Sequence, residues 1–595
     1  MAESGSAKSS VLVQAGILAA ASMLVRVIGL LYRSPLTAII GDEGNGYYGT
    51  AYNIYTIILM ISSYSIPSAI SKLMAQKLAV QDTDGARKVF RCAFGYGILV
   101  GLLGSLLLYF GASFLVPEVA VCVLQVFAPT VFLFGILGSL RGYFQAQGSM
   151  VQTSISQILE QIANAAVSIG AAWLLMSLAA GEDSTTQAQM GAMGSAMGTG
   201  AGVLTALIFM TVCYVRSRRR EPGTAMSASR TAAGAAAAGS GIVSGNGTVS
   251  GRRTAVGSGT VSGTSGAAAS PIRRHNDFPQ ILKETILVIT PFMLSGVILN
   301  ITTSLNQTIY MRILINGRGV AETAATTVYG VFSNKAVVIS NIPISIATAV
   351  AAAIIPGISA AFARRDLEDT RRRAGDAVRA TALIAIPSAV GLFVLARPIT
   401  MLLFPQMETL SLASSLLAGL AVTVIFYSVS TITNAILQSI GRMNIPLISA
   451  GIAIAVQTVV LFALLLLTDW DVEALVLCSI LYSALIFVVN LVCLKRFLGF
   501  TQDVMSVYVR PLLCAAIMGA AARLVYEGLY YLTAGVIPGS YLRNLAAVLP
   551  AVLIAVLVYA FVLVRSGTVE REMLRHLPKG DAMVRLLEKW KWLRS

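Results

Sequence analysis

The sequence predicts an all-α protein that crosses a membrane many times. Of its 595 residues, 56% are hydrophobic and only 12% are charged, and the mean hydropathy is +0.77. A soluble protein carries roughly 25% charged residues, so a water-soluble fold and a disordered chain are both excluded. The apolar segments run about 20 residues, the length that a helix needs to cross ~30 Å of hydrocarbon. A membrane barrel would show alternating segments of ~10 residues instead.

Fourteen apolar segments are long enough to span the membrane. Each is bounded by charged or turn-forming residues, which mark where the chain leaves the hydrocarbon. The predicted spans are 11–31, 47–71, 92–114, 120–140, 153–178, 190–215, 284–311, 326–356, 380–396, 409–440, 446–467, 474–494, 511–532 and 544–564.

The distribution of cations predicts the orientation. If the N-terminus is cytoplasmic, most of the 43 Lys and Arg residues fall on the cytoplasmic side, as the positive-inside rule requires. Both termini are then cytoplasmic, in a cell membrane. The net charge of +16 is therefore a topology signal, and no soluble domain is left to bind nucleic acid. The exceptions lie in outer loops or within spans: Arg33, Arg312, Arg318, Arg397 and Arg543, then Arg26, Lys335 and Arg523.

Two segments differ in composition from the spans. Residues 216–280 are rich in Gly, Ala, Ser and Thr, and they repeat GTVSG at 247–251 and 259–263. This composition predicts a disordered, basic cytoplasmic linker. The tail 568–595 has an amphipathic pattern, which fits a helix on the membrane surface or one packed on its own protein.

The linker separates six spans (1–215) from eight, and four short motifs recur in the same order on both sides. Because both halves start from the same side of the membrane, they form a parallel repeat. We expect two six-helix lobes, 1–215 and 281–497, followed by two added helices in 498–567. Such lobes enclosing a midplane cavity are typical of alternating-access transporters. The matches are Tyr48-Gly49 with Tyr329-Gly330, Ile66–Ile70 with Ile342–Ile346, Leu115–Pro117 with Leu403–Pro405, and Gln145, Gly148 and Met150 with Gln438, Gly441 and Met443.

The six cysteines occur singly within or beside apolar segments, without a CxxC motif. They are therefore interpreted as buried small hydrophobic residues. Neither a disulfide framework nor a metal site is predicted, and no cofactor is expected.

Charged and amide side chains inside the spans indicate a binding site. A Lys or Arg at a helix centre costs about 2.5–3.5 kcal/mol on insertion scales, so it should face a cavity or a partner. We expect Arg26 and Lys335, one from each lobe, to line a central cavity that favours phosphate or pyrophosphate. Alternatively, one of them forms an ion pair with Glu160, the acid of a polar stripe in the fifth span. The candidate substrate-binding residues are Arg26, Lys335, Arg33, Arg312, Asn53, Asn334 and Glu160.

Several N-terminal motifs resemble a known family. They resemble the polysaccharide-biosynthesis branch of the multidrug/oligosaccharidyl-lipid/polysaccharide exporter superfamily, near stage V sporulation protein B and the Gram-positive lipid II flippases. One departure is Tyr47, which stands where Gram-negative relatives have an acid near the start of the second helix. The motifs are Arg26–Gly29, Tyr32-Arg33, Gly41–Tyr48, Ala51–Thr56 and Pro67–Lys72.

This resemblance implies a fourteen-helix flippase that moves an undecaprenyl-pyrophosphate-linked saccharide, such as lipid II, to the outer leaflet. It implies that the cations of the first and eighth helices, here Arg26 and Lys335, face the central cavity. It also implies that the last two helices form a groove for the lipid tail. Which ion, if any, is coupled to transport stays open.

Two other functions are consistent with the composition. A cation-coupled multidrug exporter of the same superfamily should use membrane acids, and Glu160 is the one acid deep in the twelve-helix core. A membrane glycosyltransferase or polymerase should carry catalytic carboxylates or histidines on outer loops, and the longest of these loops have only about 15 residues. We therefore expect a transporter and not an enzyme.

Overall fold

The computed structural model describes residues 28–220 and 301–567, apart from 65, 80 and 443, together with Ala21, Leu24 and Val25. Eleven helices in this part of the chain are long and apolar enough to cross a membrane. They coincide with the third to sixth and the eighth to fourteenth predicted spans. The all-α membrane fold is therefore confirmed. Most of the first and seventh predicted spans, the linker after residue 220 and the tail 568–595 lie outside the described residues.

The N-lobe is built from the helices before residue 221. Their apolar faces pack on one another, and large side chains such as Phe114 and Leu178 stay exposed, as expected of surfaces that face lipid. The elements are α2 (Arg33–Leu59), a π-helical turn (Met60–Tyr64), α3 (Ile66–Ala79), α4 (Thr83–Phe110), α5 (Ala112–Leu115), a 3₁₀ turn (Glu118–Ala120), α6 (Val121–Ala146), α7 (Val151–Leu178) and α8 (Ser184–Arg220).

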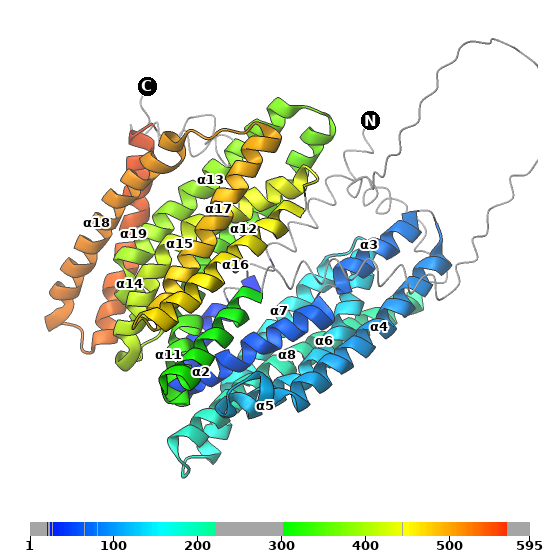
Figure 1. Cartoon of the computed structure of the whole chain (residues 1–595), viewed down its shortest axis with the longest axis horizontal. Coiled ribbons are helices and arrows are strands. Elements are labelled where there is room, and N and C mark those ends of the chain that lie inside the picture. The colour runs from blue at the N-terminus through cyan, green and yellow to red at the C-terminus, as the bar shows by residue number, and fades with distance from the viewer. Residues whose placement is uncertain are drawn as a thin grey trace, which may run out of the picture.

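The C-lobe follows with a similar order of elements, and α18 and α19 pack on its far edge (Figure 1). Residues 301–312 are helical and lead into a π-helical turn (Ile313–Gly317). The further elements are α11 (Glu322–Gly330), a π-helical segment (Val331–Ala336), α12 (Val337–Ala363), α13 (Leu367–Val394), α14 (Ala396–Leu403), α15 (Met407–Ser439), α16 (Asn444–Leu467), α17 (Val472–Leu498), a π-helical turn (Met505–Val509), α18 (Arg510–Leu532), a 3₁₀ turn (Thr533–Gly535) and α19 (Ser540–Arg565).

Equivalent helices of the two lobes begin in the same way. Asp82 caps α4 by accepting a hydrogen bond from the backbone N–H of Gly85 at 2.7 Å. Asp366 caps α13 through the N–H of Asp369 at 2.9 Å. The residue before each cap, Gln81 and Arg365 respectively, has a φ of 59°. This shared turn was not among the sequence motifs, and it supports the internal repeat independently.

The caps also explain why these helices start earlier than the sequence predicts. The third and ninth spans were predicted to begin at residues 92 and 380, whereas α4 and α13 begin at Thr83 and Leu367. A side chain that accepts from the first turn of a helix stabilises that turn in water. Polar turns thus extend both helices beyond the apolar segments by which the spans were recognised.

The second predicted span also differs at its start. The sequence predicts a loop over 32–46, but α2 is helical from Arg33 onward, with a kink at Gly41, where φ is +69°. Glycine adopts this left-handed conformation without the steric cost that a Cβ adds. The chain therefore turns at one residue, and residues 42–46 continue the membrane helix.

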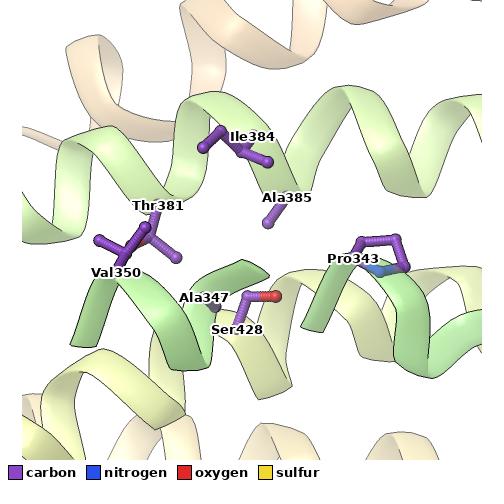
Figure 2. Close-up of a pocket in the computed structure, with 7 residues that line it drawn as sticks. All are labelled: Pro343, Ala347, Val350, Thr381, Ile384, Ala385 and Ser428. Atoms are coloured by element: carbon purple, nitrogen blue, oxygen red, sulfur yellow. The ribbon is translucent and has the colours of Figure 1, made fainter. Parts of the chain in front are cut away.

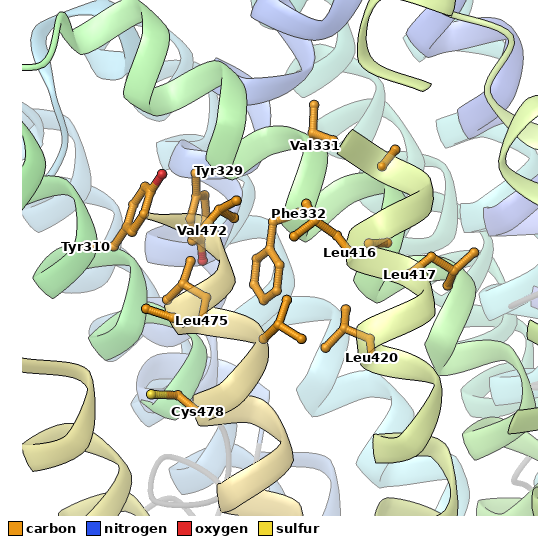
Figure 3. Close-up of a cluster of buried hydrophobic side chains, with 14 of the residues drawn as sticks. Tyr310, Tyr329, Val331, Phe332, Leu416, Leu417, Leu420, Val472, Leu475 and Cys478 are labelled. Carbon is orange, nitrogen blue, oxygen red and sulfur yellow. The ribbon is translucent and has the colours of Figure 1, made fainter. Parts of the chain in front are cut away.

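Each lobe has its own apolar core. In the C-lobe, side chains from α15 and α17 pack against Tyr329, Val331 and Phe332 beside α11 (Figure 3). Figure 1 shows α2 and α11 side by side where the lobes meet, whereas α3 and α12 lie farther apart. The two cores thus position α2 and α11 as the facing elements.

Candidate functional site between the lobes

The two lobes contact each other through a polar surface, which we call the interlobe seam. One side of it is α2, and the other is the helical segment 301–312, α11 and the π-helical segment that follows. Thr409, near the start of α15, closes one edge. The seam residues are Asp42, Asn45, Gly46, Thr50 and Asn53 in the N-lobe and Ser304, Gln307, Tyr329, Gly330, Asn334, Lys335 and Thr409 in the C-lobe.

Two glycines allow the backbones of α2 and α11 to touch. A Cβ built on Gly330 would lie 2.4 Å from the Cα of Gly46, and one built on Gly46 would lie 2.6 Å from the carbonyl oxygen of Thr326. Small residues permit such close helix approach within a membrane. Nearby, the Asn334 Nδ2 donates to the carbonyl oxygen of Asn45 at 2.7 Å. The lobes are therefore in direct contact at this end of the molecule.

Lys335 lies at the centre of the most strongly charged part of the seam. Its side chain is 1% exposed and forms an ion pair with the Asp42 carboxylate. Its Nζ also donates to the Thr409 Oγ1 at 2.9 Å, and that hydroxyl in turn donates to Asp42. The ammonium lies 5.9 Å from the centroid of the Phe404 ring. Asp42 thus neutralises the buried cation, and Thr409 and Phe404 complete its surroundings.

The π-helical segment Val331–Ala336 contributes to this placement. Asn334 and Lys335 are adjacent in sequence, yet both reach α2. Residues one apart on a regular helix point about 100° away from each other, and the wider π turn reduces that angle. Single π turns inside α-helices occur frequently at functional sites.

Asn53 is the main amide of the seam. Its Nδ2 donates to the Gln307 Oε1 at 2.6 Å and to the Tyr329 hydroxyl at 3.3 Å. Gln307 donates back to the carbonyl oxygen of Thr50 at 3.0 Å, and the Ser304 hydroxyl donates to the carbonyl oxygen of Asn53 at 3.1 Å. These four hydrogen bonds all cross between the lobes.

Glu160 has a different partner from those that the sequence suggests. The Arg141 Nη2 donates to Glu160 Oε2 at 2.6 Å, and the Arg141 Nε donates to the Ser156 hydroxyl at 3.0 Å. The Arg141 side chain is 7% exposed and that of Glu160 is 23% exposed. This pair joins α6 to α7 inside the N-lobe. Lys335 pairs with Asp42 and not with Glu160.

The remaining predicted site residues are placed as follows. Arg33 hydrogen bonds with Tyr32 and lies beside Tyr48 and Tyr52, in the N-lobe. Arg312 is exposed at the end of the helical segment 301–312. Arg26 lies outside the described residues. The structure thus brings Asn53, Asn334 and Lys335 into the seam, and it places Arg33 and Glu160 within the N-lobe.

Sequence reasoning missed two charged residues, Asp42 and Arg141. Asp42 was assigned to an outer loop, because it lies between the predicted spans 11–31 and 47–71. Arg141 follows the predicted fourth span by one residue, because that span was ended at the first charge, whereas α6 continues to Ala146. One available signal was the need for a counter-ion beside each buried charge.

A small pocket lies within the C-lobe. It lies between α12, α13 and α15 and leaves almost no space for a water molecule (Figure 2). Its lining is mainly apolar, with Thr381 and Ser428 as the polar exceptions. Ligand sites usually enclose about 300–1,000 Å³, so this pocket is too small for a saccharide. All six cysteines are free, and the described residues contain no metal-binding cluster of His, Cys, Asp or Glu.

Two family models match the chain, and they divide it at the linker. The model described as "Polysaccharide biosynthesis protein" matches residues 11–227, and the model "Lipid II flippase MurJ" matches residues 271–546. The first match covers the N-lobe, and the second covers the C-lobe, α18 and the first turns of α19.

Two curated proteins of Bacillus subtilis (strain 168) are similar in sequence. Lipid II flippase MurJ is 21% identical over 534 residues, which are 86% of this chain and 87% of that protein. Stage V sporulation protein B is 29% identical over 203 residues, 33% of this chain and 38% of that protein. These matches confirm the resemblance that the N-terminal motifs indicate.

Two solved structures share the fold. Lipid II flippase MurJ in an inward closed conformation has a TM-score of 0.57 and 14% identity, and the match covers 92% of this chain and 97% of that one. An inward-facing multidrug resistance MATE family transporter of the MOP superfamily has a TM-score of 0.58 and 14% identity. That match covers 80% of this chain and 94% of the transporter chain. At this identity the likeness shows the fold alone.

Proposed function

We propose that this chain, which belongs to the multidrug/oligosaccharidyl-lipid/polysaccharide exporter superfamily, flips a lipid-linked saccharide across the membrane by alternating access. The substrate class is an undecaprenyl-pyrophosphate-linked saccharide, and lipid II is its first candidate. The sequence similarity to a lipid II flippase over 86% of the chain supports this choice. The chain catalyses no covalent step in this proposal.

The observation that carries the mechanism is the polar interlobe seam. Polar groups buried in a membrane protein are costly unless they are paired, and a permanent contact could be made from apolar side chains. A seam of hydrogen bonds and one ion pair can be exchanged for contacts with water or with an anionic ligand. We therefore interpret the seam as a gate that closes one end of the molecule.

The predicted orientation places this gate at the outer surface. With a cytoplasmic N-terminus, α2 and α11 both begin at the outer face, so the seam lies in the outer half of the membrane. The structure then corresponds to a state that is closed to the outside. The substrate head group enters from the cytoplasmic side, between the lobes, while its polyprenyl tail stays in lipid.

Lys335 links substrate binding to gate opening in this scheme. Its ammonium is neutralised by Asp42 when the gate is closed. A pyrophosphate that reaches the seam competes with the Asp42 carboxylate for the same cation, because both are anionic hydrogen-bond acceptors. Exchange of one anion for the other would release α2 from Lys335 and open the gate. The proposal also assigns further cationic contacts with the head group to Arg26 and Arg33, as the sequence suggests.

The driving force is also part of the proposal. A membrane potential contributes about 2.3 kcal/mol per charge for each 100 mV. Since the interior of a cell is negative, the potential favours outward movement of an anionic head group.

A cation-coupled drug exporter fits the described residues less well. Such a protein uses membrane carboxylates to bind cations, whereas Asp42 and Glu160 are paired with Lys335 and Arg141. The likeness to the MATE transporter is one of fold and does not bear on the substrate.

The experiment is a depletion and re-expression assay in cells. Depletion of the protein should reduce the lipid II that is accessible at the outer surface, and wild-type protein should restore it. Protein with Arg26→Ala and Lys335→Ala together should fail to restore it, although it reaches the membrane. Arg523→Gln with Glu527→Gln, a matched removal of charges outside both lobes, should restore it. Full restoration by the Arg26 and Lys335 double variant would refute the site, and unchanged accessibility after depletion would refute the function.

A further inference from the structure

Three arginines gather where the connection between α18 and α19 meets α14. The three helices are tied together by Asn544, whose Nδ2 donates to the carbonyl oxygen of Pro398 at 3.0 Å. The Tyr526 hydroxyl donates to the Asn544 Oδ1 at 2.9 Å. Figure 1 shows these helices at the edge of the C-lobe that lies away from the N-lobe. The group, which we call the arginine cluster, consists of Arg397 in α14, Arg523 in α18 and Arg543 in α19.

Two tyrosines of α18 form the centre of the cluster. The rings of Tyr526 and Tyr530 lie 5.7 Å apart, and the Arg543 guanidinium lies 5.4 Å from the centroid of the Tyr530 ring. Arg523 and Arg397 both interact electrostatically with the Tyr526 hydroxyl. The Arg543 guanidinium therefore lies over one of these rings, and Arg523 and Arg397 lie on α18 and α14 beside them.

The cluster keeps an excess of positive charge. The Arg523 Nε donates to Glu527 Oε1 at 2.5 Å, and these side chains are 48% and 43% exposed. The two residues form a local i,i+4 ion pair within α18. Arg397 is exposed, and the Nε of Arg543 is buried without a hydrogen-bond partner. Three guanidinium groups thus face one carboxylate.

The cluster lies at the level of lipid headgroups. The apolar run of α19 over 545–564 is long enough to cross ~30 Å of hydrocarbon. Asn544 directly precedes this run, and its hydrogen bond to Tyr526 brings that part of α18 to the same height. Tyrosines are enriched at this depth, where the ring is apolar and the hydroxyl meets water.

We propose that the arginine cluster binds the phosphate of an anionic lipid headgroup in the leaflet that this end of the protein faces. Guanidinium groups bind phosphate oxygens with paired hydrogen bonds, and basic pockets between membrane helices bind anionic lipid headgroups. The exposed guanidinium of Arg397 is available as a donor. Arg543 is partly buried, and its Nη2 donates to the carbonyl oxygen of Ala534 at 3.3 Å, a contact that a phosphate oxygen can replace. Arg523 forms an ion pair with Glu527 and is therefore not counted among the free donors.

This site is separate from the interlobe seam and does not rest on the flippase function. Two lipids carry the required phosphate chemistry at a membrane surface. One is an anionic phospholipid of the bilayer, and the other is a polyprenyl pyrophosphate.

The test measures lipid binding to the purified full-length chain in detergent by native mass spectrometry. The probes are phosphatidylglycerol, undecaprenyl pyrophosphate and, as a lipid without net charge, phosphatidylcholine. Arg397→Gln with Arg543→Gln removes the two available cations and leaves the Arg523 pair intact. With about 1 kcal/mol per basic residue near a lipid surface, binding of the recognised lipid should weaken roughly 30-fold. Arg365→Gln, which removes an exposed cation outside the cluster and outside the candidate substrate site, should leave binding unchanged.

A selective loss of phosphatidylglycerol binding would support the site and identify a phospholipid as its ligand. A selective loss of undecaprenyl pyrophosphate binding would support the site and assign it to the polyprenyl lipid. Equal binding of both anionic lipids to the double variant and the wild type, or an equal loss with Arg365→Gln, would overturn the proposal.

Discussion

Replacement of Asp42 by Asn tests the gate at its strongest contact. The Lys335 side chain is 1% exposed and has Asp42 as its counter-ion. Removal of one partner of a buried ion pair usually costs about 3–5 kcal/mol, because the other charge stays uncompensated. Separation of the lobes would let water reach Lys335, so this cost falls on the closed state. The ratio of closed to open molecules should therefore fall roughly 100-fold or more.

The assay is a distance measurement between spin labels at the gated end of the two lobes. Labels at Glu182→Cys and Asp469→Cys occupy exposed loops, one on each lobe, in a background without the six native cysteines. The Asp42→Asn variant should shift the distance distribution to longer values. Asp42→Asn with Lys335→Gln, which removes both charges, should shift it much less. Identical distributions for Asp42→Asn and the parent protein would refute the role of this ion pair in closing the gate.

Two further variants test the packing of the seam and of the N-lobe. Gly330→Ala should separate the lobes and reduce flipping at least several-fold, because its Cβ would lie 2.4 Å from the facing backbone. Gly170→Ala is the control, because a Cβ at that position meets nothing within 4 Å. It should behave like wild type in the same transport assay. Glu160→Gln should lower the free energy of unfolding by about 3–5 kcal/mol, because Arg141 stays buried without its counter-ion. Glu527→Gln, which breaks a half-exposed ion pair, should lower it by less than about 1 kcal/mol. Equal unfolding temperatures for the two glutamate variants would contradict the structural role of Glu160.

The sequence predicted the membrane helices well but not their ends. Apolar length alone identifies a span, because hydrocarbon thickness is fixed. The ends depend on caps such as Asp82 and Asp366, which stabilise polar turns that hydropathy does not register. The loop predicted over 32–46 was too long, because the left-handed conformation of Gly41 lets the chain turn at a single residue.

The candidate site was predicted in part. Lys335, Asn334 and Asn53 were recognised because polar groups within an apolar span require partners, and all three lie in the seam. Their partners were not predicted, because Asp42 is nearly three hundred positions away from Lys335 in sequence and the register between the lobes is set by packing. The glycine contact between α2 and α11 fixes that register, and composition and periodicity do not encode it.

Transport by the purified protein is the most direct test of the proposed function. The measurement is the appearance of labelled lipid II in the opposite leaflet of sealed proteoliposomes, read by its accessibility to an enzyme added outside. The wild-type chain should accelerate translocation without converting the lipid, and the Arg26→Ala and Lys335→Ala double variant should not. A rate equal to that of protein-free liposomes, or a rate unaffected by the double variant, would contradict the proposed gate and its cationic path.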